Sequence, residues 1–86
     1  MTQRLDEEVV VNCQFDTVHK KVKPISVFWG HRQYVVKKLG LYHHYRVGLK
    51  RIHVFSVITT NLFMRLELNS HDLSWRLTEI ADGLPE

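Results

Sequence analysis

The sequence of 86 residues contains one cysteine, Cys13, so the chain cannot form an internal disulfide. A single thiol fits a reducing compartment. No apolar run approaches the roughly 20 residues that a membrane-spanning helix needs. The first residues include acids where a secretion signal has a basic leader and a long apolar stretch. We therefore expect a cytoplasmic protein with no membrane association.

Acidic residues are missing from the whole middle of the chain, from Thr17 to Leu66. This span holds ten of the twelve lysines and arginines and five of the six histidines, while all nine acids lie in the two ends. The net charge of +3 therefore understates the local imbalance. Fifty residues with no negative charge create a positive field, which predicts a negatively charged partner.

The sequence also lacks the groupings that catalysis and metal binding require. Its carboxylates form no recognisable pair, and no glycine-rich phosphate loop is present. Cys13 lies in a valine-rich stretch, where a buried and inert thiol is the ordinary outcome. His43 and His44 are adjacent, so on a strand they point to opposite sides, whereas zinc needs three or four converging ligands. We expect no enzyme activity, no metal site and no cofactor.

What is present is the pattern of β-strands, most clearly in the stretch KPISVFWGHRQYVVKK. Gly30-His31 suits a two-residue type II′ turn because glycine stands first. This turn sets Trp29 opposite Arg32. Pro24 has no amide hydrogen and should begin its strand. Further pairs in this register are Val27 with Tyr34 and Ile25 with Val36, and the face that they share predicts core positions for Ile25, Val27, Trp29, Tyr34 and Val36.

Alternation and β-branched residues predict further strands. A turn at Thr60-Asn61 sets Val57 opposite Met64 and Phe55 opposite Leu66, and it predicts core positions for His53, Phe55 and Val57. The final segment also fits a two-turn helix capped by Asp72, although the pairing needs of its neighbours favour a strand. The predicted strands are Glu8–Phe15, Ile25–Trp29, Arg32–Leu39, Arg51–Thr60, Leu62–Leu68 and Ser74–Ala81.

These segments predict one small all-β domain over residues 1–86, an antiparallel meander of five to six strands. The outward positions Ile52, Val54 and Ile58 are too apolar for full exposure, so the sheet should be curled or barrel-like. Residues 1–7 are polar and are expected to be a loose N-terminus. Residues 40–50, enclosing Gly40 and Gly48, are expected to be an inserted basic and aromatic loop.

The chain resembles a family of short uncharacterised bacterial β domains. The resemblance rests on a valine strand after Glu8, the spacing Pro24-x4-Trp29-x4-Tyr34-x-Val36, a variable insertion, a strand hairpin and a closing Trp75-x-Leu77. These core-type residues span most of the chain. The resemblance implies a small β fold, and it implies no activity because the family has no settled function. The insertion with Gly40 and paired histidines departs from the family's Trp- and Arg-rich insertion.

The basic, aromatic stretch predicts a function in binding nucleic acid. Cations neutralise phosphates and release counterions, and flat rings stack on unpaired bases. We therefore predict a non-enzymatic binder of single-stranded nucleic acid, with DNA and RNA both open. Phosphate contacts are assigned to Lys37, Lys38, Arg46, Lys50 and Arg51, and stacking to Tyr42, His44 and Tyr45.

A role in protein interaction is the alternative. Unpaired strand edges and the apolar outward side chains Val54, Ile58 and Phe63 would support a homodimer. The basic middle of the chain would also suit an acidic protein partner. The two kinds of binding are compatible with each other.

Overall fold

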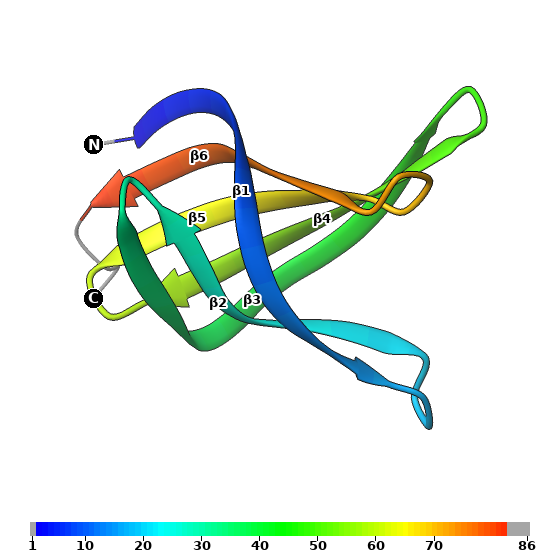
Figure 1. Ribbon diagram of the computed structural model, residues 1–86, viewed down its shortest axis with the longest axis horizontal. Helices are drawn as coiled ribbons and strands as arrows, with labels where there is room; N and C mark the ends of the chain where they lie inside the picture. The colour runs from blue at the N-terminus through cyan, green and yellow to red at the C-terminus, as the bar shows by residue number, and fades with distance from the viewer. Residues whose placement is uncertain (1, 83–86) are drawn as a thin grey trace.

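The computed structural model describes residues 2–82, which form six antiparallel strands in a closed barrel (Figure 1). Each strand pairs with the next along the chain, and β1 also pairs with β6, which completes the ring. The predicted all-β meander is confirmed, and the final segment is a strand. The strands are β1 Thr2–Asp16, β2 Lys21–Trp29, β3 Arg32–Val47, β4 Lys50–Thr59, β5 Leu62–Asn69 and β6 Ser74–Asp82.

The core of the barrel is apolar and built mainly by β4, β5 and β6. Alternate side chains of these strands face the axis, as the two-residue period of a strand requires. The predicted pairs Val57–Met64 and Phe55–Leu66 are both present. Apolar burial on this scale is the main force that holds a small domain together. The buried cluster consists of Val9, Val27, Phe55, Val57, Met64, Leu66, Leu68, Trp75 and Leu77.

The β2–β3 hairpin has the predicted register, with Trp29 opposite Arg32 and Val27 opposite Tyr34. Its turn is a different type, because Gly30 and His31 have φ values of 60° and 63°. Two positive φ values define a type I′ turn rather than the expected II′.

The predicted start and inner face of β2 need correction. β2 begins at Lys21, and Pro24 lies within the strand beside a register shift in β1 after Asn12. An irregular ladder tolerates a residue with no amide hydrogen. The same irregularity turns Ile25 outward, so this side chain is exposed rather than in the core, and the structure does not pair it with Val36.

The N-terminal residues 2–7 are part of β1 and not a loose segment. Thr2, Gln3 and Arg4 pair with β6, and Leu5 packs against the core. Glu7 accepts a hydrogen bond from the Trp29 indole at 3.3 Å. The polar composition of residues 2–7 does not indicate a strand, although the pairing of this segment with β6 closes the barrel.

Residues 40–50 are not an inserted loop either. β3 continues to Val47, turns at Gly48-Leu49 and returns as β4. Gly48 has a φ of 62°, which favours glycine. Two bulges interrupt β3, one at Lys37 and one where Gly40 and Leu41 together oppose Ser56. Bulges bend a strand and increase its twist, so they disguised the alternation that marks a strand.

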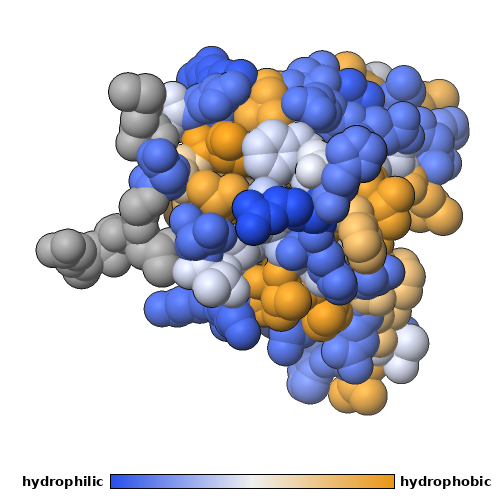
Figure 2. All heavy atoms as spheres, turned by 60° about the vertical axis from the view of Figure 1, so that its left-hand side comes forward, coloured by the Kyte–Doolittle hydropathy of each residue, from blue (hydrophilic) through white to orange (hydrophobic). Residues whose placement is uncertain are grey.

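The two ends of the barrel differ. At the closed end lie the short β2–β3 and β4–β5 turns. The β1–β2, β3–β4 and β5–β6 turns lie at the open end, where the first two hairpins diverge (Figure 1). They are the β1–β2 arm, residues 12–26, and the β3–β4 arm, residues 42–55. Figure 2 brings the closed end forward and shows its hydrophobic side chains in small groups separated by hydrophilic ones. A binding surface is therefore better sought at the open end.

Candidate functional site

The β3–β4 arm carries aromatic and cationic side chains on one of its two faces. Residues directly opposite each other in an antiparallel pair share a face. Three such pairs, Tyr42–Phe55, His44–His53 and Arg46–Arg51, therefore project from the same side of the ladder. Phe55 belongs to the barrel core, so this side is the continuation of the barrel interior. We call these six residues the inner face.

The rings of the inner face are in mutual contact. The Tyr42 ring lies 5.0 Å from that of Phe55 and 5.9 Å from that of His53, with only 18° between the planes of Tyr42 and His53. The Tyr42 hydroxyl is hydrogen-bonded to Nδ1 of His53 at 2.6 Å. Trp75 continues the series from Phe55 into the core, with a centroid distance of 5.5 Å. The Tyr42 ring is thus held on several sides while its side chain stays 52% exposed.

The surroundings of His53 displace its protonation. Burial lowers the pKa of its imidazole, and the neighbouring His44 and Arg51 lower it further by charge repulsion. Both causes disfavour the imidazolium form. At neutral pH the ring is therefore mostly neutral, and it lies end to end with the Tyr42 ring, with 18° between the two planes.

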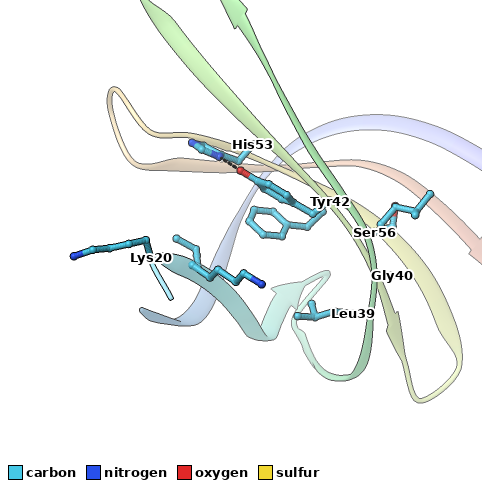
Figure 3. Close-up of a pocket in the computed structure, with 10 residues that line it drawn as sticks. Lys20, Leu39, Gly40, Tyr42, His53 and Ser56 are labelled. Atoms are coloured by element: carbon cyan, nitrogen blue, oxygen red, sulfur yellow. Dashed lines mark hydrogen bonds between the residues drawn. The ribbon is translucent and has the colours of Figure 1, made fainter. Parts of the chain in front are cut away.

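A pocket of about 280 Å³ lies at the base of this face, in a gap between β2 and β3. The two strands pair only from Ser26 to Trp29 and from Arg32 to Val35, so the wall opens beyond that point. In Figure 3, Tyr42 and His53 form one side, Gly40 and Ser56 lie at the β3–β4 side, and Lys20 lies across the opening. The pocket therefore joins the two arms.

The lining of this pocket contains two cations, Lys20 and Lys21, and no acid. The nearest acid along the β1–β2 arm is Asp16, which is opposite Lys21 in the ladder. Its carboxylate lies 2.7 Å from Nδ1 of His19 and also accepts the backbone amide of that residue. These hydrogen bonds with His19 are the main reason that the pKa of Asp16 is lowered. The carboxylate is thus engaged within its own turn.

The structure separates the predicted site residues into two groups. Tyr42, His44, Arg46 and Arg51 are together on the inner face. Lys38, Tyr45 and Lys50 belong to the opposite, outer face, because they pair with Ile58, Ile52 and Val47 respectively. Lys37 occupies the first bulge of β3.

Tyr45 in particular has a structural partner. Its hydroxyl donates a hydrogen bond to Glu67 at 3.2 Å, across the intervening strand β4. The side chain therefore passes over β4 near Val54, an outward residue that is only 1% exposed. Burial, then the charge of Glu67 and the hydrogen bond to it, raise the pKa of Tyr45. This ring covers the barrel wall and is not placed with Tyr42 and His44.

The sequence did not assign Lys20, Lys21, His53 or Phe55 to the site. His53 and Phe55 were predicted as core residues of their strand, and Phe55 is indeed buried. Lys20 and Lys21 lie some twenty residues before Tyr42, and only the barrel brings them beside it. The available signal was their membership of the acid-free span from Thr17 to Leu66.

A second pocket, of about 380 Å³, lies on the other side of the β1–β2 arm, between β1 and β6. Pairing of these strands ends at Val9 and Trp75, so the wall opens here too. The lining is mostly apolar, includes Cys13 and Phe15, and contains the acid Glu8 rather than a cation. Its chemistry is unlike that of the first pocket.

Within residues 2–82 no three His, Cys, Asp or Glu side chains are grouped so as to hold a metal ion. The same part of the chain has no helix that could cross a membrane. Comparison of the chain with protein-family models, curated proteins and solved structures found no match. The resemblance to short bacterial β domains therefore stays a prediction.

Proposed function

We propose that this chain is a non-enzymatic module that binds single-stranded nucleic acid along the inner face and the pocket at its base. One observation carries the proposal: a continuous row of rings and cations on one side of the β3–β4 arm. The rings Tyr42, His44 and His53 are in contact, and Arg46 and Arg51 stand beyond them toward the tip. A reducing, cytoplasmic setting, supported by the single thiol of Cys13, belongs to the same proposal.

The charge and shape of the open end support this partner. Stacking on aromatic rings requires bases whose faces are free, and in a duplex the neighbouring bases already cover those faces. A single strand passing between the two arms would meet Tyr42 from one side and Lys20 or Lys21 from the other. The ten cations and no acids of residues 17–66 add a long-range attraction for phosphates.

The test is a fluorescence anisotropy titration with labelled oligothymidine, oligouridine and a duplex of equal length. We expect the single strands to bind more tightly than the duplex, with affinity falling steeply between about 50 and 200 mM salt. The comparison of thymidine with uridine strands decides between DNA and RNA. Absence of binding at low salt would contradict the proposal.

A matched pair of variants locates the site. Arg46→Gln with Arg51→Gln should reduce the slope of log affinity against log salt by about 0.7 for each phosphate that the protein no longer neutralises. Arg4→Gln with Arg32→Gln removes the same charge from exposed positions outside the open end and should leave that slope unchanged. Equal effects of the two double variants would place the phosphate-binding residues elsewhere.

Self-association is the second candidate function, and a separate surface favours it. Large apolar side chains are exposed on and beside the β1–β2 arm, among them Val10, Phe15 and Val18, and Leu73 is exposed next to the second pocket. Exposed apolar groups of this kind mark contact surfaces. Light scattering coupled to size-exclusion chromatography measures the mass in solution, and a monomer at high protein concentration would contradict this candidate.

A further inference from the structure

We infer that the pocket between β2 and β3 takes a single nucleobase of the bound strand, stacked on Tyr42, with the adjoining phosphate held by Lys20 and Lys21. This inference rests on the proposed function and adds a specific requirement to it. Binding should depend on the presence of a base at one position of the strand, and not only on the phosphate backbone.

The size of the pocket fits one flat ring. Its volume of about 280 Å³ is at the small end of ligand pockets, which hold drug-sized molecules at roughly 300–1,000 Å³. The lining is largely apolar, with a few polar groups, which is the usual composition of such pockets.

The ring that would receive the base is already held in place. Tyr42 contacts Phe55, and its hydroxyl is hydrogen-bonded to Nδ1 of His53 at 2.6 Å (Figure 3). A side chain that is fixed before binding loses little conformational entropy when the ligand arrives. About half of its surface stays free to be covered.

The second bulge of β3 shapes the side of the pocket where the base edge would lie. Gly40 and Leu41 oppose Ser56, so one residue of the bulge is left out of the regular ladder. A Cβ atom at Gly40 would lie 3.2 Å from the carbonyl oxygen of Ser56, which is tighter than ordinary contact. Glycine thus permits the close approach of β3 and β4. Gly40, Leu41 and Ser56 all line the pocket, so the backbone of the bulge offers the polar groups that a base edge would meet on this side.

The opposite wall supplies the positive charge that a nucleotide needs. Lys20 and Lys21 both line the pocket where the β1–β2 turn enters β2. Lys20 lies across the opening from Gly40 and Ser56 (Figure 3). Asp16, which is opposite Lys21 in the ladder, is hydrogen-bonded to His19. A base and its phosphate can therefore be held from the two arms at once, which neither arm achieves alone.

The experiment replaces bases one at a time in the shortest oligothymidine that binds with full affinity. Each position in turn carries an abasic sugar, which keeps the phosphate and removes the ring. We expect one position at which affinity falls by about 5- to 150-fold, the contribution of one stacked base. At the other positions the loss should be clearly smaller. Equal losses at all positions would overturn the inference while leaving the proposed function intact.

Variants of the protein connect that position to this pocket. In Tyr42→Ala the abasic penalty at the sensitive position should disappear, because no ring remains to stack on. In Tyr45→Ala, whose ring lies on the outer face, the penalty should persist. A penalty that survives in Tyr42→Ala would place the base elsewhere and overturn the inference.

Two further measurements separate the possible outcomes. If the intact oligonucleotide does not bind at low salt, the proposed function fails first. Thymidine monophosphate tests a free nucleotide as the ligand. Binding of the monophosphate as tight as that of the strand would overturn the inference, because the pocket would then serve a free nucleotide. Much weaker binding that still requires Tyr42 supports it.

Discussion

The two faces of the β3–β4 arm have similar side chains and different surroundings. Each carries a tyrosine and at least one histidine and one cation, and adjacent residues such as His43 and His44 fall on opposite faces. On the inner face Tyr42 is hydrogen-bonded to His53 and lines the pocket, whereas on the outer face Tyr45 is hydrogen-bonded to Glu67 over β4. Composition alone therefore does not mark a binding residue. The face of the strand decides whether a ring is available to a ligand or belongs to the barrel wall.

The largest expected difference between the two faces is seen when each tyrosine is removed in turn. Tyr42→Ala should weaken binding of a single strand by about 5- to 150-fold, the contribution of one stacked base. Tyr45→Ala should leave that affinity unchanged, because its ring faces away from the pocket. Anisotropy titrations at one salt concentration measure both. Equal losses would mean that the two faces are not functionally distinct.

The stability of the protein should depend on Tyr45 as well, through its place over β4. Tyr45→Ala removes the side chain that crosses β4, and we expect the free energy of unfolding to fall by about 1–2 kcal/mol. Tyr45→Phe keeps the ring and removes only the hydrogen bond to Glu67, so the loss should be smaller, at about 0.5 kcal/mol. Urea denaturation followed by tryptophan fluorescence measures both values. A larger loss in Tyr45→Phe than in Tyr45→Ala would contradict the role of the ring as cover.

The dependence of stability on pH should report on the inner face, through His53. The folded state lowers the pKa of His53 through burial and the charges of His44 and Arg51. Stability from the neutral ring is therefore complete above the ordinary histidine value of about 6.5 and is lost as pH falls through the lowered pKa. His53→Phe should remove part of this acid sensitivity, as measured by thermal unfolding between about pH 5 and 8.

Binding of nucleic acid should change with pH in the opposite sense. Phosphates near His53 favour its charged form, so affinity should rise as pH falls, while the stability of the free protein falls. The groups that face His53 are Tyr42, His44 and Arg51, together with the two lysines across the pocket. An affinity that is independent of pH in the wild type would contradict this linkage.

The smallest expected difference in affinity is between variants of the adjacent histidines His43 and His44. His44→Ala removes a ring 6.2 Å from Tyr42 and should reduce affinity by about 2- to 5-fold, as expected for one exposed ring or charge contact. His43→Ala changes the adjacent residue on the outer face and should have no effect on affinity. Because the two residues are neighbours, the pair controls for charge and for position along the arm.

The sequence predicted the fold where the strands are regular. The hairpin around Gly30-His31 and the pairing of Val57 with Met64 follow from turn residues and strict alternation, and both are correct. Residues 40–50 were assigned to a loop because the two bulges hide their alternation. The first bulge turns Leu39 instead of Lys38 toward the interior, and the second restores Tyr42 to it. A sequence shows neither bulge, since each depends on how the partner strand approaches.

The site was predicted only in part, because the pairing with the partner strand decides which face each residue occupies. The stretch from Tyr42 to Arg51 was identified from its composition, and about half of its assigned residues share the inner face. The division of Tyr42 from Tyr45 follows from the register with β4, which local pattern does not determine. The sequence could not place Lys20 and Lys21 in the site, because they lie beside Tyr42 only when the strands close into a barrel.

The short pairing of β2 with β3 has a consequence for motion. Four residue pairs join these strands, against nine between β3 and β4. Backbone amides in a seam so short should exchange with solvent sooner than those of the long ladder, because local opening starts where the fewest bonds must break. The seam ends at the pocket, so fraying from that side would widen the aperture without disturbing the core around Leu66 and Leu77. The entrance of the pocket would then adapt its width to the size of the incoming base.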